Sequence, residues 1–117
     1  MNNAFAIMKP EMIECMITEY HWGRSMMTLK LSRQGTPDIQ YIKFAGVEVF
    51  SGPLTWTGAN FILRPTSECL ELLQSAERIS EYVTEKDLIE RNILLYIIEL
   101  QFIQVQIVCH MANKYSG

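Results

Sequence analysis

The spacing of apolar residues changes at Pro65, and that change divides the chain into a strand-rich first part and a helical segment. Beyond Pro65, apolar residues recur three or four positions apart, as on the buried face of a helix. They are Cys69, Leu72, Leu73, Ala76, Ile79 and Val83. Thr66 or Ser67 can cap the first turn, where Glu68 suits the positive end of the helix dipole. We therefore expect a helix that packs this face, with Leu72 and Leu73, against a sheet.

A second, shorter helix is expected to begin at Thr84. Asp87 stands three residues later, the spacing at which the two side chains can form a capping box. Leu88 and Ile89 follow as its apolar residues.

The part of the chain before Pro65 has the pattern of strands separated by turns. Extended segments are expected at residues 26–31, 39–44, 47–50 and 54–63, with loops at 34–38 and 51–53. Within 54–63, residues 58–60 suggest a bulge or a turn. Residues 12–22 are ambiguous, but 22–25 would make a hairpin turn into the strand that starts at Met26.

The last third of the chain contains its most apolar region. Residues 102–111 alternate and are rich in β-branched side chains, which favours a strand. Residues 93–100 could pair with that strand or continue the helix that starts at Thr84. The missing Gly, Asn or Asp near Glu99 argues against a tight hairpin, but 93–98 is apolar on every side, which favours a strand.

These elements predict an α+β fold, an antiparallel sheet packed against one or two acidic helices. The 117 residues fit a single domain, and no linker, repeat or low-complexity segment divides them. We therefore treat residues 1–117 as one domain.

Acidic residues are concentrated in the helical segment. Between Glu68 and Glu90 there are seven acidic residues against Arg78 and Lys86, a net charge of −5. A surface of one sign can steer an oppositely charged protein and speed its association. The same pattern would also arise if these were only the solvated faces of two helices. The candidate partner-binding acids are Glu68, Glu71, Glu77, Glu81, Glu85, Asp87 and Glu90.

Two tryptophans are further candidates for partner binding. Trp22 and Trp56 stand beside turn-forming residues, where an exposed aromatic side chain would suit an interface. Packing against the sheet is the alternative for both.

Composition argues against nucleic acid and membrane as partners. The net charge of −3 disfavours binding to phosphates, which depends on Lys and Arg. The apolar region 93–111 is interrupted by polar side chains, whereas a membrane-spanning helix needs about 20 mostly apolar residues. The first ten residues lack the basic start and apolar stretch of a secretory signal. We expect a cytoplasmic protein.

The sequence contains no recognisable catalytic or metal-binding motif. Cys15, Cys69 and Cys109 lie far apart among apolar residues, as buried free thiols do, which favours a reducing compartment. No other ligand type clusters with His21 or His110, and His110 and Cys109 would point to opposite faces of a strand. We therefore expect no enzymatic activity, cofactor or metal.

In size, charge and the order of sheet and acidic helices, the chain resembles the bacterial immunity proteins that neutralise cognate toxins, including those of contact-dependent growth inhibition systems. The resemblance extends over the whole chain but involves no shared motif, so no functional residue can be transferred. It implies a tight complex with a basic toxin domain, often a nuclease.

Two other functions stay open. One is a small enzyme or small-molecule-binding sheet protein with a pocket lined by Trp56, Tyr20 and His21. The other is a phage-encoded inhibitor of a host defence complex, which would use the same acidic surface.

Overall fold

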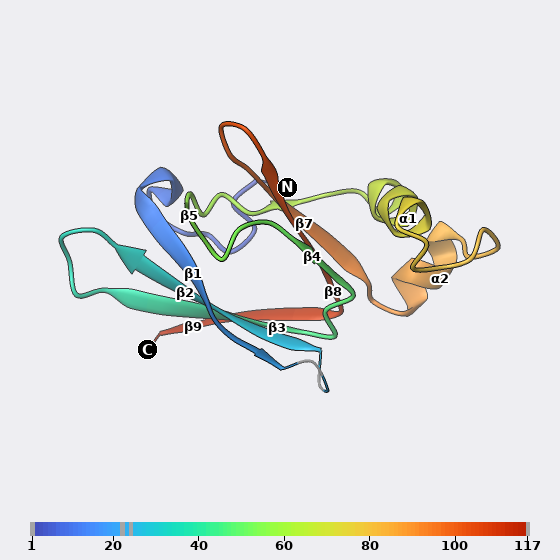
Figure 1. Ribbon diagram of the computed structural model, residues 1–117, viewed down its shortest axis with the longest axis horizontal. Helices are drawn as coiled ribbons and strands as arrows, with labels where there is room; N and C mark the ends of the chain where they lie inside the picture. Colours follow the sequence, from blue (N-terminus) through green and yellow to red (C-terminus); the bar gives the residue numbers. More distant parts are fainter. Residues whose placement is uncertain (1, 22, 24, 117) are drawn as a thin grey trace.

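The computed structural model describes residues 2–21, 23 and 25–116, and it consists of two antiparallel sheets and two α-helices (Figure 1). The first sheet has the strand order β5-β1-β2-β3-β9. Its strands are β1 (Ile13–His21), β2 (Met26–Arg33), β3 (Ile39–Ala45), β5 (Thr55–Thr57) and β9 (Met111–Ser116). The second sheet has the order β4-β8-β7-β6. Its strands are β4 (Val49–Ser51), β6 (Ile62–Leu63), β7 (Leu94–Glu99) and β8 (Gln104–Cys109).

The helices α1 (Thr66–Ser75) and α2 (Glu85–Glu90) lie together at one end of the molecule, on the right in Figure 1. They pack on the face of the second sheet that points away from the first sheet. The α+β fold expected from the sequence is therefore confirmed, but the strands form two sheets where one was expected.

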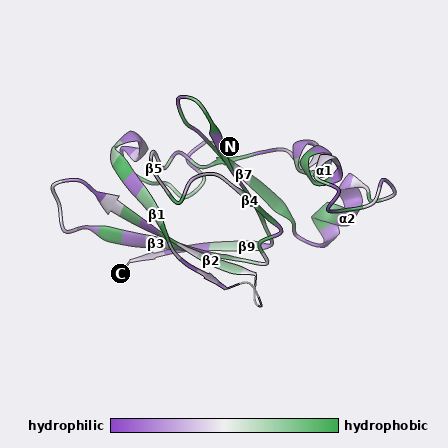
Figure 2. Cartoon of the chain, viewed as in Figure 1, coloured by the Kyte–Doolittle hydropathy of each residue, from purple (hydrophilic) through white to green (hydrophobic). Residues whose placement is uncertain are grey.

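Strand β7 of the second sheet is buried on both faces from Leu95 to Ile98 because it is apolar on both sides there. Tyr96 and Ile98 enter the core between the two sheets, while Leu95 and Ile97 enter a second core beneath the helices. Figure 2 shows the consequence as a hydrophobic band along β7. This arrangement explains the apolar run at 93–98 and confirms that it is a strand, not a continuation of a helix.

The hairpin between β7 and β8 forms without Gly, Asn or Asp because its loop is longer than a two-residue turn. Glu99 pairs with Gln104, and the loop between them is Leu100–Ile103. The Leu100 amide donates to the Ile103 carbonyl at 2.9 Å and closes the loop. Loops of four residues do not require the positive φ angles of the shortest turns.

The segment 102–111, expected as one strand, is two strands in different sheets. β8 ends at Cys109 in the second sheet, and β9 begins at Met111 in the first. His110 stands at this crossover, and its amide donates to the Ala45 carbonyl at the end of β3. The segment 54–63 is divided in the same way between β5 and β6.

His110 joins three parts of the structure at the crossover. Its Nδ1 lies 2.9 Å from the Arg91 carbonyl at the end of α2, and its Nε2 lies 3.2 Å from a carboxylate oxygen of Glu48. The Asn92 side chain donates to the His110 carbonyl at 2.9 Å. The ring packs directly against Gly46, which has a positive φ of 64°.

The helix expected after Pro65 is shorter than the apolar spacing indicated. It ends at Ser75 because Glu77 adopts the left-handed conformation, with φ of 55°. The amides of Glu77 and Arg78 donate back to Gln74 and Leu73, the pattern of a Schellman motif. Ile79 and Val83 lie beyond the helix but still pack against the second core.

The two helix starts differ from each other. The capping by Thr66 or Ser67 was wrong, because Pro65 occupies the N-cap position and no side chain caps α1. The capping box of α2 is confirmed, with the Thr84 amide donating to Asp87 at 2.9 Å and the Asp87 amide to Thr84 at 3.4 Å.

The ambiguous segment 12–22 contains the whole of β1, which pairs with β2 up to His21 and Met26. The hairpin turn expected at 22–25 includes Trp22 and Arg24, which lie outside the described residues. A short 3₁₀ helix at Pro10–Met12 precedes β1. Upstream of it, Phe5 packs its ring against Phe61 and Tyr96, with centroids 5.1 and 5.2 Å away, at one end of the first core.

Replacing Leu73 by alanine should lower the free energy of unfolding by about 2–5 kcal/mol, as other buried leucine truncations do. Leu73 is 1% exposed beneath α1, so the change leaves a cavity in the second core. A denaturant melt measures the effect, and a loss below about 0.5 kcal/mol would contradict the packing of α1 on the sheet.

Gly46→Ala should destabilise the protein more than Gly35→Ala. Both glycines have positive φ, 64° and 82°, so both substitutions carry similar backbone strain. A Cβ at Gly46 would lie 2.7 Å from the His110 ring, whereas a Cβ at Gly35 has no neighbour within 4 Å. We expect a difference of about 1–3 kcal/mol in the free energy of unfolding, because overpacking forces the His110 ring to move. Equal losses would show that the crossover yields easily.

Candidate partner-binding surface

The outer face of the second sheet is covered by helices over only part of its length. Leu95, Ile97 and Val108 lie on this face beneath α1 and α2. Further along the same two strands, the face carries Glu99 and two glutamines. This polar part has no apolar surface for a helix to cover, and it borders an open groove beside α1. The groove, called the sheet groove below, is lined by Ile62, Arg64, Glu68, Glu71, Leu72, Ser75, Ala76, Leu95, Ile97, Glu99, Gln104 and Gln106.

The charges of the sheet groove are mostly acidic. Arg64 forms a two-pronged ion pair with Glu68, with Nε 2.7 Å from Oε2 and Nη2 hydrogen-bonded to Oε1. This hydrogen bond lowers the pKa of Glu68, while the hydrogen bond and charge of Glu68, with Glu99 more weakly, raise the pKa of Arg64. Three carboxylates, those of Glu68, Glu71 and Glu99, thus stand against one guanidinium.

The other acids of the segment 68–90 divide into two groups. Asp87 is held in the capping box, where hydrogen bonds from the Thr84 amide and hydroxyl lower its pKa. Glu90 lies 3.9 Å from Lys86. Four acids are exposed and have no ion pair within the described part of the chain. These are Glu71, Glu77, Glu81 and Glu85.

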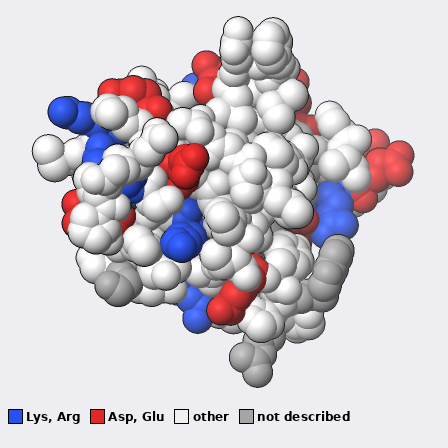
Figure 3. Space-filling view, turned by 60° about the vertical axis from the view of Figure 1, so that its left-hand side comes forward, with Lys and Arg blue, Asp and Glu red and all other residues white. Residues whose placement is uncertain are grey.

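The structure brings only part of the predicted acidic set together. Glu68 and Glu71 meet in the sheet groove, one helical turn apart on α1. Glu77 and Glu81 lie in the segment of the chain that connects α1 to α2, and the remaining three acids lie on α2. In the view of Figure 3, acidic and basic groups are interspersed over much of the visible face, so this face carries no single sign of charge.

Trp56 does not belong to an exposed surface. It is 8% exposed within the first core, and its indole N–H donates to the Gly58 carbonyl at 2.9 Å. The expectation of an exposed interface aromatic was therefore wrong for Trp56, because the alternating pattern of β5 turns this side chain inward. Trp22 lies outside the described residues.

The residues suggested for a small-molecule pocket are separate. Tyr20 lines a hollow with Phe50 and Leu54, and neither His21 nor Trp56 is among its lining residues. His21 instead lies on the surface, with Nε2 3.1 Å from a carboxylate oxygen of Glu19.

The positions of the histidine, cysteine and acidic side chains do not support a metal site or a reactive thiol. Within residues 2–21, 23 and 25–116, no group of three or more His, Cys, Asp and Glu side chains is placed to hold a metal ion. Cys15, Cys69 and Cys109 are free and buried. Burial raises the pKa of their thiols to about 12, 11 and 12, respectively, which disfavours the reactive thiolate.

No family model, curated protein or solved structure matches this chain. The fold and its surfaces are therefore the basis for any functional proposal. In the described residues, no helix combines the length and the apolar character needed to cross a bilayer.

Sequence reasoning missed two parts of this surface. Glu99, Gln104 and Gln106 were seen as strand residues, but their meeting with α1 depends on how the strands pair. Phe102 and Ile103 were assigned to a strand, yet they lie in the β7–β8 loop and are 87% and 51% exposed. The sequence did contain a signal for this loop, because Phe102 and Ile103 stand next to the polar residues that end the two strands.

The buried thiols predict a loss of stability in alkali. An unfolded thiol ionises near pH 9, whereas the folded protein keeps its thiols protonated up to about pH 11 or 12. The folded state then binds more protons, so this contribution to stability is intact below pH 9 and is lost as the pH rises above it. Denaturant melts at about pH 8 and pH 10 measure the decline. The decline should be smaller in Cys15→Ala, and an equal decline would contradict this origin.

Proposed function

We propose that the protein is a non-catalytic binding module that recognises a basic protein, and that it acts as an immunity protein against a toxin domain of that kind. The observation that carries this proposal is the sheet groove, where Glu68, Glu71 and Glu99 border an open surface that also exposes apolar side chains. This surface is acidic, and among the described residues it has neither an exposed thiol nor a group of His, Cys, Asp and Glu side chains placed to hold a metal ion.

The groove suits the side chains of Lys and Arg. The half-buried Ile62 and Leu72 and the exposed Ala76 offer apolar contacts for a hydrocarbon stem. The carboxylates of Glu71 and Glu99 offer acceptors for the charged head group. Both carboxylates are exposed, so their attraction for a cationic side chain should weaken as the salt concentration rises.

The proposed partner follows from the same electrostatics. An enzyme that binds the phosphates of nucleic acid is positively charged around its site. A protein with an acidic groove is complementary to that surface and can cover it. A nuclease-type toxin domain is therefore the partner that we propose, in the cytoplasm, where the three buried thiols would stay reduced.

The immunity role is tested in cells. The toxin domain encoded immediately upstream of the gene for this chain is expressed alone and together with the chain. We expect growth to stop with the toxin domain alone and to resume with both. The absence of a toxin gene at that position, or growth arrest in spite of co-expression, would contradict the immunity role.

Reversing the acidic charges should slow association with that toxin domain. The variant Glu71→Lys/Glu81→Lys is compared with Glu14→Lys/Asp38→Lys, which changes the net charge by the same amount at exposed positions on the first sheet and its loop. Because long-range attraction acts on the encounter, the first variant should lower the association rate about tenfold at low salt and change dissociation less.

The measurement is stopped-flow or surface-plasmon-resonance binding with a catalytically inactive toxin domain at two salt concentrations. The difference between the two variants should shrink at high salt. Equal effects of both pairs would mean that only net charge matters, and unchanged rates in the first variant would place the interface away from α1.

A further inference from the structure

The β7–β8 loop presents large apolar side chains to solvent at a projecting point of the molecule. The hairpin tip, defined as Leu100–Ile103, stands above the body at the top of Figure 1. Phe102 is 87% exposed and Ile103 is 51% exposed. The loop is short and is closed by the hydrogen bond from the Leu100 amide to the Ile103 carbonyl at 2.9 Å. The backbone that carries Phe102 is therefore held by its two strands, and little backbone entropy would be lost on binding.

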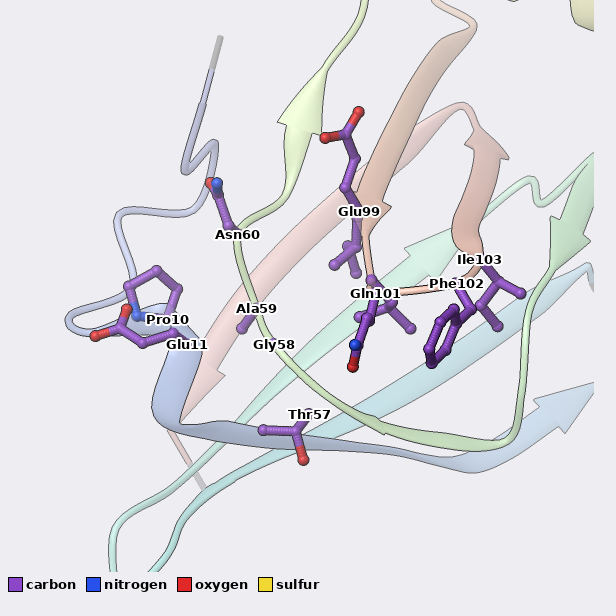
Figure 4. A pocket seen from close by; sticks show the side chains of 12 residues that line it. Pro10, Glu11, Thr57, Gly58, Ala59, Asn60, Glu99, Gln101, Phe102 and Ile103 are labelled. Atoms are coloured by element: carbon purple, nitrogen blue, oxygen red, sulfur yellow. The ribbon is translucent and has the colours of Figure 1, made fainter.

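The tip separates two recessed surfaces. On one side is a mainly apolar hollow of about 650 Å³ between the loop and the segment Thr57–Asn60. On the other side is the sheet groove, and Glu99 lines both. Figure 4 shows Gln101 and Phe102 projecting from the loop on the side of Thr57, while the Glu99 carboxylate points the other way.

The surroundings of the tip are acidic. Glu11 and Glu99 are the charged residues that line the hollow, and Glu71 lies in the adjoining groove. In Figure 3 the protrusion at the top is uncharged, with acidic groups on either side of its base. These carboxylates disfavour an anionic lipid surface and also the same surface of a second copy, because like charges would face each other.

We propose that the hairpin tip is the apolar anchor of the interface with the basic protein partner. The partner buries Phe102 and Ile103 while its Lys and Arg side chains meet Glu71 and Glu99. This inference rests on the proposed function and adds a division of roles. The acids govern the rate of encounter, and the tip governs how long the complex lasts, since buried aromatic side chains dominate the energetics of interface centres.

The tip can be tested with three short peptides that separate charge from apolar contact. The probe is acetyl-Arg-Trp-Arg-amide. In one control alanine replaces tryptophan, and in the other citrulline, a neutral analogue of similar shape, replaces both arginines. Each is titrated into isotopically labelled protein, and the shifts of backbone amide resonances in residues 68–72 and 99–104 are followed by NMR.

We expect the probe to bind at about millimolar concentration and to shift both regions. The alanine peptide should shift residues 68–72 but have little effect on 99–104, and the citrulline peptide should bind more weakly than the probe. Phe102→Ser should weaken binding of the probe about three- to tenfold, as expected for the loss of an aromatic contact. Tyr82→Ser is the matched control, because Tyr82 is also highly exposed (83%) but lies in the segment that connects α1 to α2, not in the hairpin tip.

The outcomes distinguish the two proposals. If the alanine peptide binds as well as the probe and Phe102→Ser has no effect, the tip is not an anchor, although the acidic groove is still supported. If none of the peptides shifts residues 99–104, the inference is overturned as well. A loss of binding in Phe102→Ser counts only with an unchanged melting temperature, and Ile103→Ser provides the same test if that variant is unstable.

Discussion

The burial of β7 on both faces is the constraint on which the rest of the structure depends. β7 supplies Tyr96 and Ile98 to one core and Leu95 and Ile97 to the other, so this strand can exist only with cover on both sides. The first sheet provides one cover, and the helices provide the other. Helices of ten and six residues are marginally stable by themselves, so α1 and α2 depend on packing against the sheet. In return they shield the apolar outer face of β7 from water.

The same strand also decides where the cover stops. From Leu95 to Glu99 the outer face of β7 changes from apolar to acidic. The same face of β8 changes from apolar at Val108, opposite Leu95, to polar at Gln104, opposite Glu99. Beyond that point a helix would bury polar groups without partners, which costs free energy. The open groove is thus a direct consequence of the residues that end the second core, and the acids of α1 border it because α1 lies along that boundary.

The features that could be predicted from the sequence are those that local chemistry determines. Thr84 and Asp87 are three residues apart, so their capping box needs no tertiary information. The apolar run of β7 was recognisable because no amphipathic surface helix has apolar residues on every side. The crossover at His110 was not recognisable, because each half of 102–111 alternates well and only the pairing partners show that the halves belong to different sheets. The end of α1 at Ser75 was missed because Glu77 is an unusual residue for a left-handed position. The groove and the hairpin tip were missed for a similar reason, since both depend on long-range pairing.

The crossover at His110 and the hairpin tip are opposite ends of the same two strands. At one end, Leu94 pairs with Cys109. The next residue, His110, has polar contacts with Arg91, Asn92 and Glu48. At the other end, Glu99 pairs with Gln104, and the chain projects into solvent. The β7–β8 hairpin is therefore fixed at the crossover and buried between the two cores over the part that contains Leu95 and Ile97. The hairpin tip projects although its loop is short, because the strands β7 and β8 themselves extend outward to it.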